Sequence, residues 1–227
     1  MPASDSHNSL FPEICDQYAA RTKTVLGPYA AYAWREDPRH LFFSLSRYKF
    51  AARMLAGAET LLEAGCGDAF ATPILLQEVG RVFGIDVVPE AIAHANLHAA
   101  RGGKASYACH DLIKAPLERR FDAALSLDVI EHIPPELEDR FVGNLAASLI
   151  PHAACVVGTP NHAASPYASS ASAREHVNLK DQATLKELLA KHFHNVFIFS
   201  MNDEMVHTGF YPMAHYLLAL AVDPKWS

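Results

Sequence analysis

From residue 58 onward, the chain alternates short apolar runs with stretches in which apolar residues recur at helical spacing. Runs of this length that are rich in aliphatic residues and bounded by Gly, Asp or Pro are typical of buried strands. We predict strands at residues 60–64, 81–86, 105–109, 121–127, 153–158 and 195–200, and helices at about 71–79, 89–100, 135–149 and 181–191. Strands that alternate with helices indicate βα units and a mostly parallel sheet.

The first part of the chain has helical periodicity only. Asp37 and Pro38 form a good helix start, since Asp caps free N–H groups and Pro fits the first turn, and the apolar pattern that follows stops at Gly57. We therefore expect an N-terminal helical segment, residues 1–57, ahead of an α/β domain at residues 58–227. The aromatic residues within 29–43 could serve as a lid or as the contact face of a homodimer.

Two later segments are ambiguous by pattern alone. The apolar run at 213–222 could be a helix or a strand. Residues 160–178 form a long Ala/Ser-rich stretch without periodicity, and loops of that length are usually functional or mobile.

Composition narrows the functional classes. The 227 residues are 50% hydrophobic, which suits one globular domain, and the net charge of −6 with no Lys/Arg cluster disfavours a nucleic-acid partner. No apolar run is long enough to span a membrane, and the start of the chain lacks the features of a signal peptide. Four cysteines without paired spacing are typical of reduced thiols. We expect a cytoplasmic protein that is not bound to a membrane.

Candidate chemistry begins where the first predicted strand ends. The strand runs into Glu63 and then into a turn that carries Gly65 and Gly67, which allow a ligand to approach the backbone closely. The second strand ends at Asp86, and an acid there can accept both ribose hydroxyls of an adenosine.

A nicotinamide cofactor is the less favoured occupant of this turn. The dinucleotide fingerprint needs a third glycine at position 70, where the chain has Phe70. The carboxylates of Glu63 and Asp68 would repel a pyrophosphate, yet they suit a ligand that carries an ammonium and a sulfonium cation. An NAD-linked oxidoreductase therefore stays as a distant alternative.

Four motifs in order, EAGCGDAF, GIDVVPEAI, HDL and FDAALSLDVIEHIP, resemble those of class I S-adenosylmethionine (SAM)-dependent methyltransferases. The similarity is to the small-molecule branch that includes the ubiquinone-biosynthesis type of O-methyltransferase. The resemblance implies a Rossmann-like α/β fold with helices on both faces of a seven-stranded, mostly parallel sheet, ordered 3-2-1-4-5-7-6. Strand 7 would be antiparallel and formed by residues 213–222.

The resemblance also implies roles on the cofactor side, with SAM as donor and S-adenosylhomocysteine (SAH) as product. Gly65, Cys66 and Gly67 resemble the turn beneath the methionine part of SAM. Asp86 resembles the acid that holds the ribose, and Val87 would lie against the adenine.

Further cofactor positions follow from the later motifs. Asp111 is similar to the acid that accepts the adenine amino group, with the Leu112 amide beside it, although Asp111 could equally be a helix cap. Leu127 and Asp128 end the fourth strand, at the edge where open α/β sheets bind ligands. Arg47 resembles an arginine that grips the cofactor carboxylate, and a solvated surface arginine is the alternative.

The acceptor side is less defined. His176 is the first candidate for a group that acts on the acceptor, and His132 could shape the pocket or serve as a base; a structural histidine is the alternative for His176. The acidic residues beside His132 could hold a divalent metal, as in some relatives. We do not expect one, because many metal-free enzymes carry the same residues and magnesium prefers more oxygen ligands.

Together these features predict a methyltransferase that transfers the methyl group of SAM to a small-molecule acceptor. A histidine base suits a hydroxyl on a sugar, a phenol or another metabolite. An N-methyltransferase of a small amine and a non-catalytic SAM-binding subunit are the alternatives.

Overall fold

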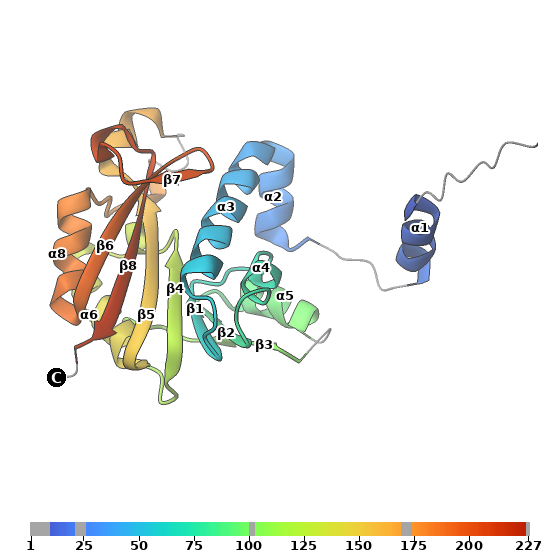
Figure 1. Ribbon diagram of the computed structural model, residues 1–227, viewed down its shortest axis with the longest axis horizontal. Helices are drawn as coiled ribbons and strands as arrows, with labels where there is room; N and C mark the ends of the chain where they lie inside the picture. The colour runs from blue at the N-terminus through green and yellow to red at the C-terminus, as the bar shows by residue number, and fades with distance from the viewer. Residues whose placement is uncertain (1–9, 21–25, 100–102, 169–173, 226–227) are drawn as a thin grey trace, which may run out of the picture.

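The computed structural model describes residues 10–20, 26–99, 103–168 and 174–225. Its centre is an eight-stranded sheet in the order β3-β2-β1-β4-β5-β8-β6-β7 (Figure 1). The strands are β1 (Thr60–Ala64), β2 (Arg81–Asp86), β3 (Ala105–Cys109), β4 (Phe121–Leu127), β5 (Leu149–Pro160), β6 (Phe193–Asn202), β7 (Met205–His207) and β8 (Tyr216–Pro224). Strands β1 to β5 pair in parallel, whereas β8 is antiparallel to both of its neighbours.

The predicted Rossmann-like class and strand order are confirmed, with one correction. The apolar run at 213–222 supplies strand β8 between β5 and β6, as the resemblance implied. The sheet has eight strands instead of seven, because the short strand β7 folds back on β6 as a hairpin at the edge.

Helices surround the sheet. Those of the N-terminal segment are α1 (Leu10–Ala20), α2 (Pro28–Glu36) and α3 (Pro38–Met54). The later ones are α4 (Thr72–Leu75), α5 (Pro89–Ala99), α6 (Pro135–Ala147) and α8 (Gln182–His192), with short 3-10 turns η1 (Ile130–His132), η2 (His162–Tyr167) and η3 (Tyr211–Met213). None of the helices in the described ranges is long and apolar enough to cross a bilayer.

Helix α4 is much shorter than the predicted 71–79. The residues after it bond to the segment that precedes β1 instead of continuing the helix: the Glu78 carbonyl accepts from Gly57 N–H at 3.0 Å, and Gly80 N–H donates to the Ala58 carbonyl at 2.9 Å. These tertiary hydrogen bonds outweigh the local helical preference of the segment.

Side chains alternate between two cores along the strands, since successive residues of a strand point to opposite faces. On one face Leu61 and Leu125 pack with α3 and α4, and on the other Leu62 and Ala124 pack with α6 and α8. Helix α5 lies against β2 and β3. This packing fixes the strand ends, and the carboxyl ends of β1, β2 and β4 lie at one edge of the sheet.

Candidate functional site

The glycine turn after β1 has the backbone geometry that the sequence predicts for it. Gly65 and Gly67 have φ angles of +79° and +53°, a region that favours glycine. A Cβ on Gly65 would clash with a methyl carbon of Val129, so no larger residue fits without movement. The amides of Gly65 and Cys66 both donate to the Ile85 carbonyl, at 2.8 and 3.0 Å, which ties the turn to β2.

Asp86 lies directly across from this turn. Its Oδ2 accepts from Gly67 N–H at 2.9 Å, and its Oδ1 accepts from Val88 N–H at 2.9 Å. Each carboxylate oxygen can accept a second hydrogen bond, so the group is oriented and still able to receive a pair of hydroxyls. Val87, next to it, is 60% exposed and offers an apolar surface at the same edge. These residues fit an adenosine.

Glu63 and Asp68 have structural partners that the sequence did not predict. Both are buried. Glu63 accepts from Tyr48 Oη at 2.8 Å and from Thr72 Oγ1 at 3.0 Å, and Asp68 accepts from the amides of Ala30 and Phe70 at 3.1 and 3.2 Å. Because these carboxylate oxygens already accept hydrogen bonds within the protein, we expect Glu63 and Asp68 to attract a cationic ligand through their electrostatic potential and not through direct contact.

Burial changes the ionisation of two groups beneath the turn. Desolvation raises the pKa of Glu63 from 4.5 to about 7, although the hydrogen bonds from Tyr48 and Thr72 oppose the shift. Desolvation also raises the pKa of the Cys66 thiol, and the charges of Glu63 and Asp86 add to the rise. Cys66 is thus a neutral packing residue of the turn and no nucleophile.

Arg47 is buried, which rules out the solvated surface arginine. Its Nη1 lies 2.9 Å from both carboxylate oxygens of Asp128, and its guanidinium stands over the Tyr216 ring, 3.8 Å from the centroid. Burial is the largest single effect and lowers the pKa of Arg47, but Asp128, Tyr216 and Glu131 together outweigh it, and the pKa is raised overall. Its Nε has no hydrogen-bond partner among the described residues. The structure thus pairs two predicted cofactor residues with each other.

The remaining predicted cofactor residues lie along the same edge. Asp111 caps its own turn, since Oδ1 accepts from Ile113 N–H at 2.9 Å and Oδ2 is 3.4 Å from Lys114 Nζ. Leu112 and Leu127 are buried in the core. The capping role of Asp111 is therefore observed, and its predicted contact with adenine stays a prediction.

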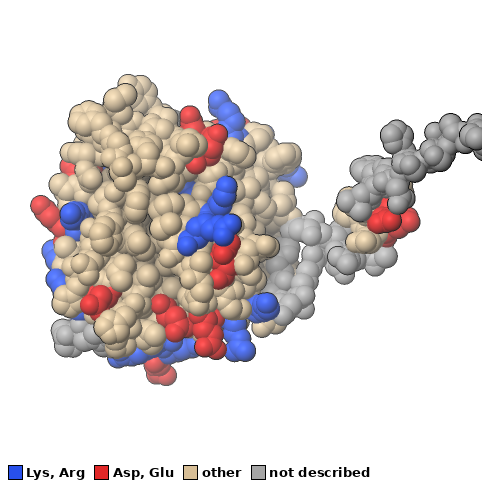
Figure 2. Space-filling view, viewed as in Figure 1, with Lys and Arg blue, Asp and Glu red and all other residues tan. Residues whose placement is uncertain are grey.

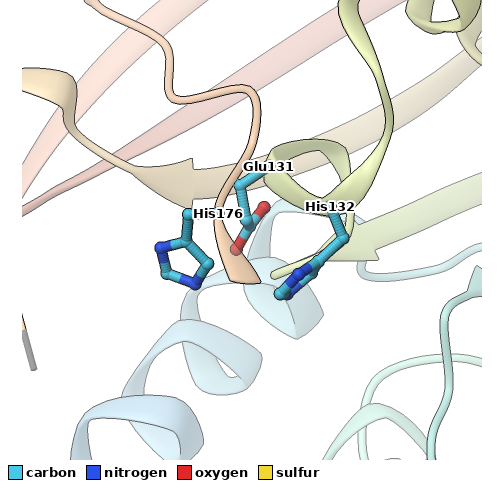
Figure 3. A group of neighbouring side chains, drawn as sticks. All are labelled: Glu131, His132 and His176. Carbon is cyan, nitrogen blue, oxygen red and sulfur yellow. The ribbon is translucent and has the colours of Figure 1, made fainter. Parts of the chain in front are cut away.

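The two predicted catalytic histidines come together. His132, at the end of η1, and His176 have ring centroids 5.1 Å apart, and His132 Nδ1 lies 3.2 Å from the Glu175 carbonyl oxygen. Figure 3 shows the Glu131 carboxylate between the two rings. Ligand atoms of these three residues all lie within 4.8 Å of one another, a spacing that could hold a metal ion.

Burial shifts the pKa of two members of this histidine cluster, His176 and Glu131. Desolvation and the neighbouring His132 lower the pKa of His176, which keeps its imidazole available as a base or a ligand. Desolvation and the charge of Asp128 raise the pKa of Glu131 to about 8. Glu131 accepts from Thr159 Oγ1 at 3.1 Å through one oxygen, while the other is buried without a partner among the described residues.

The loop that carries His176 is anchored to the sheet edge. Val177 and Asn178 donate from their amides to the Glu131 carbonyl at 2.9 and 3.0 Å, and Asn178 Nδ2 donates to Glu138 at 2.6 Å. The sequence suggested no partner for this loop. The distant pairing of His176 with His132 arises from these backbone bonds, which no sequence motif signals.

Residues 62–157 match the family model described as a methyltransferase domain. The ubiquinone biosynthesis O-methyltransferase of Arabidopsis thaliana mitochondria is 35% identical over 120 residues, or 51% of this chain and 37% of that protein. The enzyme of the same name from Bradyrhizobium sp. (strain ORS 278) is 32% identical over 44% of this chain and 40% of its own length. The chain spans less than half the length of these curated relatives.

Solved structures share the fold at low sequence identity. The N-methyltransferase NodS from Bradyrhizobium japonicum WM9, in complex with SAH, superposes with a TM-score of 0.60 at 21% identity, over 85% of this chain and 92% of that one. Magnesium protoporphyrin IX methyltransferase from Synechocystis PCC 6803 with bound SAM has a TM-score of 0.56 at 16% identity, over 94% and 92%. The chain therefore shares the fold of these SAM-dependent methyltransferases, and residues 62–157 match a methyltransferase domain.

Proposed function

We propose that the protein transfers the methyl group of SAM to a hydroxyl of a small molecule. The observation that carries the proposal is Asp86, whose carboxylate is fixed across from the Gly65–Gly67 turn with lone pairs left for a ribose. The named activities of the curated relatives support the choice of a hydroxyl acceptor.

Different residues of the chain would bind the donor and act on the acceptor. When bound, SAM supplies an electrophilic methyl group on a sulfonium, so the protein needs chiefly to orient the acceptor and exclude water. The turn and Asp86 would hold the donor, with Val87 against the adenine. His176 or His132 would take the proton of the acceptor hydroxyl, which their imidazoles can do near neutral pH.

A divalent cation is a second candidate for the histidine cluster. The buried oxygen of Glu131 without a partner points to a missing ligand, and two imidazoles with one carboxylate suit zinc or manganese better than magnesium. A cation there would bind the acceptor oxygen and lower its pKa, and the same histidines would then be ligands instead of bases.

An amine acceptor and a non-catalytic role have less support. NodS is an N-methyltransferase, and an amine that binds deprotonated would need no base, so an amine is kept as the second substrate class. A non-catalytic SAM-binding subunit would not need the pair of neighbouring histidines, His132 and His176, beside the site. We further propose a cytoplasmic enzyme without a nucleic-acid or membrane partner, which could form a homodimer.

The test is calorimetric titration with SAH. We expect wild-type protein to bind SAH and Asp86→Ala to bind at least about 100-fold more weakly, because two charge-assisted hydrogen bonds are lost. Asp16→Ala, which changes an exposed acid on α1, is the matched control and should bind as wild type does. Binding of NAD in place of SAH would overturn the proposal. Labelled SAM with phenol and amine acceptors then separates the substrate classes.

A further inference from the structure

Helix α2 is fastened to the glycine turn by a carboxylate from outside the helix. The N-cap residue of α2, Gly27, has no side chain that could cap the helix. Asp68 takes this role, since its Oδ2 accepts from Ala30 N–H, and a Cβ on Gly27 would clash with the same oxygen. The start of α2 is therefore held against the residue that follows Gly67.

This attachment places Tyr29 over the turn. Its ring carbons Cδ2 and Cε2 lie 3.5 and 3.9 Å from the point where a Cβ on Gly67 would stand. Desolvation raises the pKa of Tyr29, and the charges of Asp86, Asp68 and Glu175 add to the rise. The side chain thus packs over Gly67 and lies within the electrostatic influence of Asp86, the predicted ribose acid.

Tyr29 is nevertheless 59% exposed, so much of its surface is free. An aromatic face attracts a cation such as a sulfonium or an ammonium, and the buried acids beside it give the site a negative field. Tyr32 on the same helix is 66% exposed and has no such neighbours in the described contacts. The two tyrosines of α2 are therefore chemically different.

We propose that Tyr29 is a further SAM-binding residue and that α2 covers the methionine end of the bound cofactor. The inference rests on the proposed function. It assigns to α2 the exclusion of water from the sulfonium, with Asp68 as the attachment that keeps the helix in place. It also gives a role to the Tyr29 ring, which packs over Gly67.

The experiment is titration of the full chain with SAH in Tyr29→Ala, Tyr29→Phe and Tyr32→Ala. We expect Tyr29→Ala to weaken binding at least about fivefold, and the other two to stay within about twofold of wild type, because the ring and not the hydroxyl makes the contact. The melting temperature without ligand should be nearly the same in all three. A fall in the melting temperature of Tyr29→Ala with unchanged affinity would show that the ring only supports the turn.

Hydrogen exchange gives a second measurement that needs no variant. We expect SAH to slow amide exchange in residues 28–36 of wild-type protein. Equal exchange of these residues with and without SAH would overturn the proposal that α2 covers the cofactor. Wild-type protein that binds no SAH at all would refute the proposed function itself. Wild-type binding with Tyr29→Ala equal to it would refute only the inference.

Discussion

Burial destabilises the charged form of the Glu63 carboxylate. It is fully buried beneath the turn, and its two oxygens are held by the hydroxyls of Tyr48 and Thr72. The hydrogen bonds favour the charged form, but desolvation is the larger effect and raises the pKa to about 7. Its pKa in the folded chain therefore lies close to neutral pH.

Glu63 gives a pH-dependent stability that one substitution can test. Because its pKa rises from 4.5 in the unfolded chain to about 7 in the folded one, the folded chain binds more protons between these values, and the free energy of unfolding falls as the pH rises through this range. Glu63→Gln keeps the hydrogen-bonding shape without the charge. We expect it to gain up to about 3 kcal/mol relative to wild type on going from pH 4.5 to pH 8.

Urea unfolding at several pH values measures this effect. Glu59→Gln, at an exposed position just before β1, is the control and should follow the wild-type profile. Glu131, with a pKa raised to about 8, adds a similar slope that both variants retain. Parallel profiles for wild type and Glu63→Gln would contradict the assignment.

The histidine cluster leads to a second prediction at this scale. If the second candidate, a cation in the histidine cluster, is correct, the protein will bind one zinc or manganese ion per chain, and His176→Ala will weaken this binding at least about tenfold through loss of a ligand. His40→Ala, an exposed histidine on α3, should bind as wild type does. Calorimetry with the metal chloride is the measurement. If wild-type protein takes up no ion, the two histidines keep only the role of base.

The positions of candidate residues were predictable from the sequence where a motif and a strand end coincide. Asp86 and the Gly65–Gly67 turn lie as expected, because a parallel sheet brings successive strand ends to one edge. The pairing of Arg47 with Asp128 and the position of His176 depend on contacts between distant segments. No local pattern carries that information.

At the scale of elements, strands β1 to β4 begin and end where the sequence predicts, because each is a short apolar run with a turn residue at its end. The short form of helix α4 and strand β7 were not predicted. The first is shortened by hydrogen bonds to Gly57 and Ala58, and the second is a three-residue hairpin arm too short to show periodicity.

The capping of α2 by Asp68, a residue outside the helix, can be tested by hydrogen exchange. We expect Asp68→Ala to speed amide exchange in the first turn of α2 about fivefold, which corresponds to loss of about 1 kcal/mol of capping. Asp37 caps α3, because its Oδ1 accepts from Arg39 N–H. Asp37→Ala removes this cap and serves as the control. It should affect the first turn of α3 and leave α2 unchanged. Equal exchange of α2 in wild type and Asp68→Ala would show that Asp68 does not hold it.

At the scale of the whole molecule, the net charge is −6, and on one face the charged side chains are dispersed. Figure 2 shows acidic and basic side chains interspersed on the face that it draws, without a continuous basic surface among the atoms it colours. This distribution agrees with a net charge of −6 and with a small acceptor in place of a polyanion.

Strand β8 determines whether the whole sheet holds together. It pairs with β5 on one side and β6 on the other, and Leu217, Leu218 and Ala219 are fully buried. We expect deletion of residues 216–227 to abolish cooperative thermal unfolding, since the loss exceeds the net stability of a typical domain. Deletion of residues 1–20 is the control. It should leave the melting temperature nearly unchanged, because the side chains described in α1 are exposed. A cooperative transition in the first deletion would contradict this role.

The position of β8 also has a consequence for synthesis. Although it lies inside the sheet, it is made after both of its neighbours, so the edges of β5 and β6 stay open while the ribosome is still translating. Open edges pair readily with other chains, and non-local pairing is slow to form. The nascent protein is therefore most prone to aggregation in the interval between completion of β6 and release of β8, when a chaperone would protect it best.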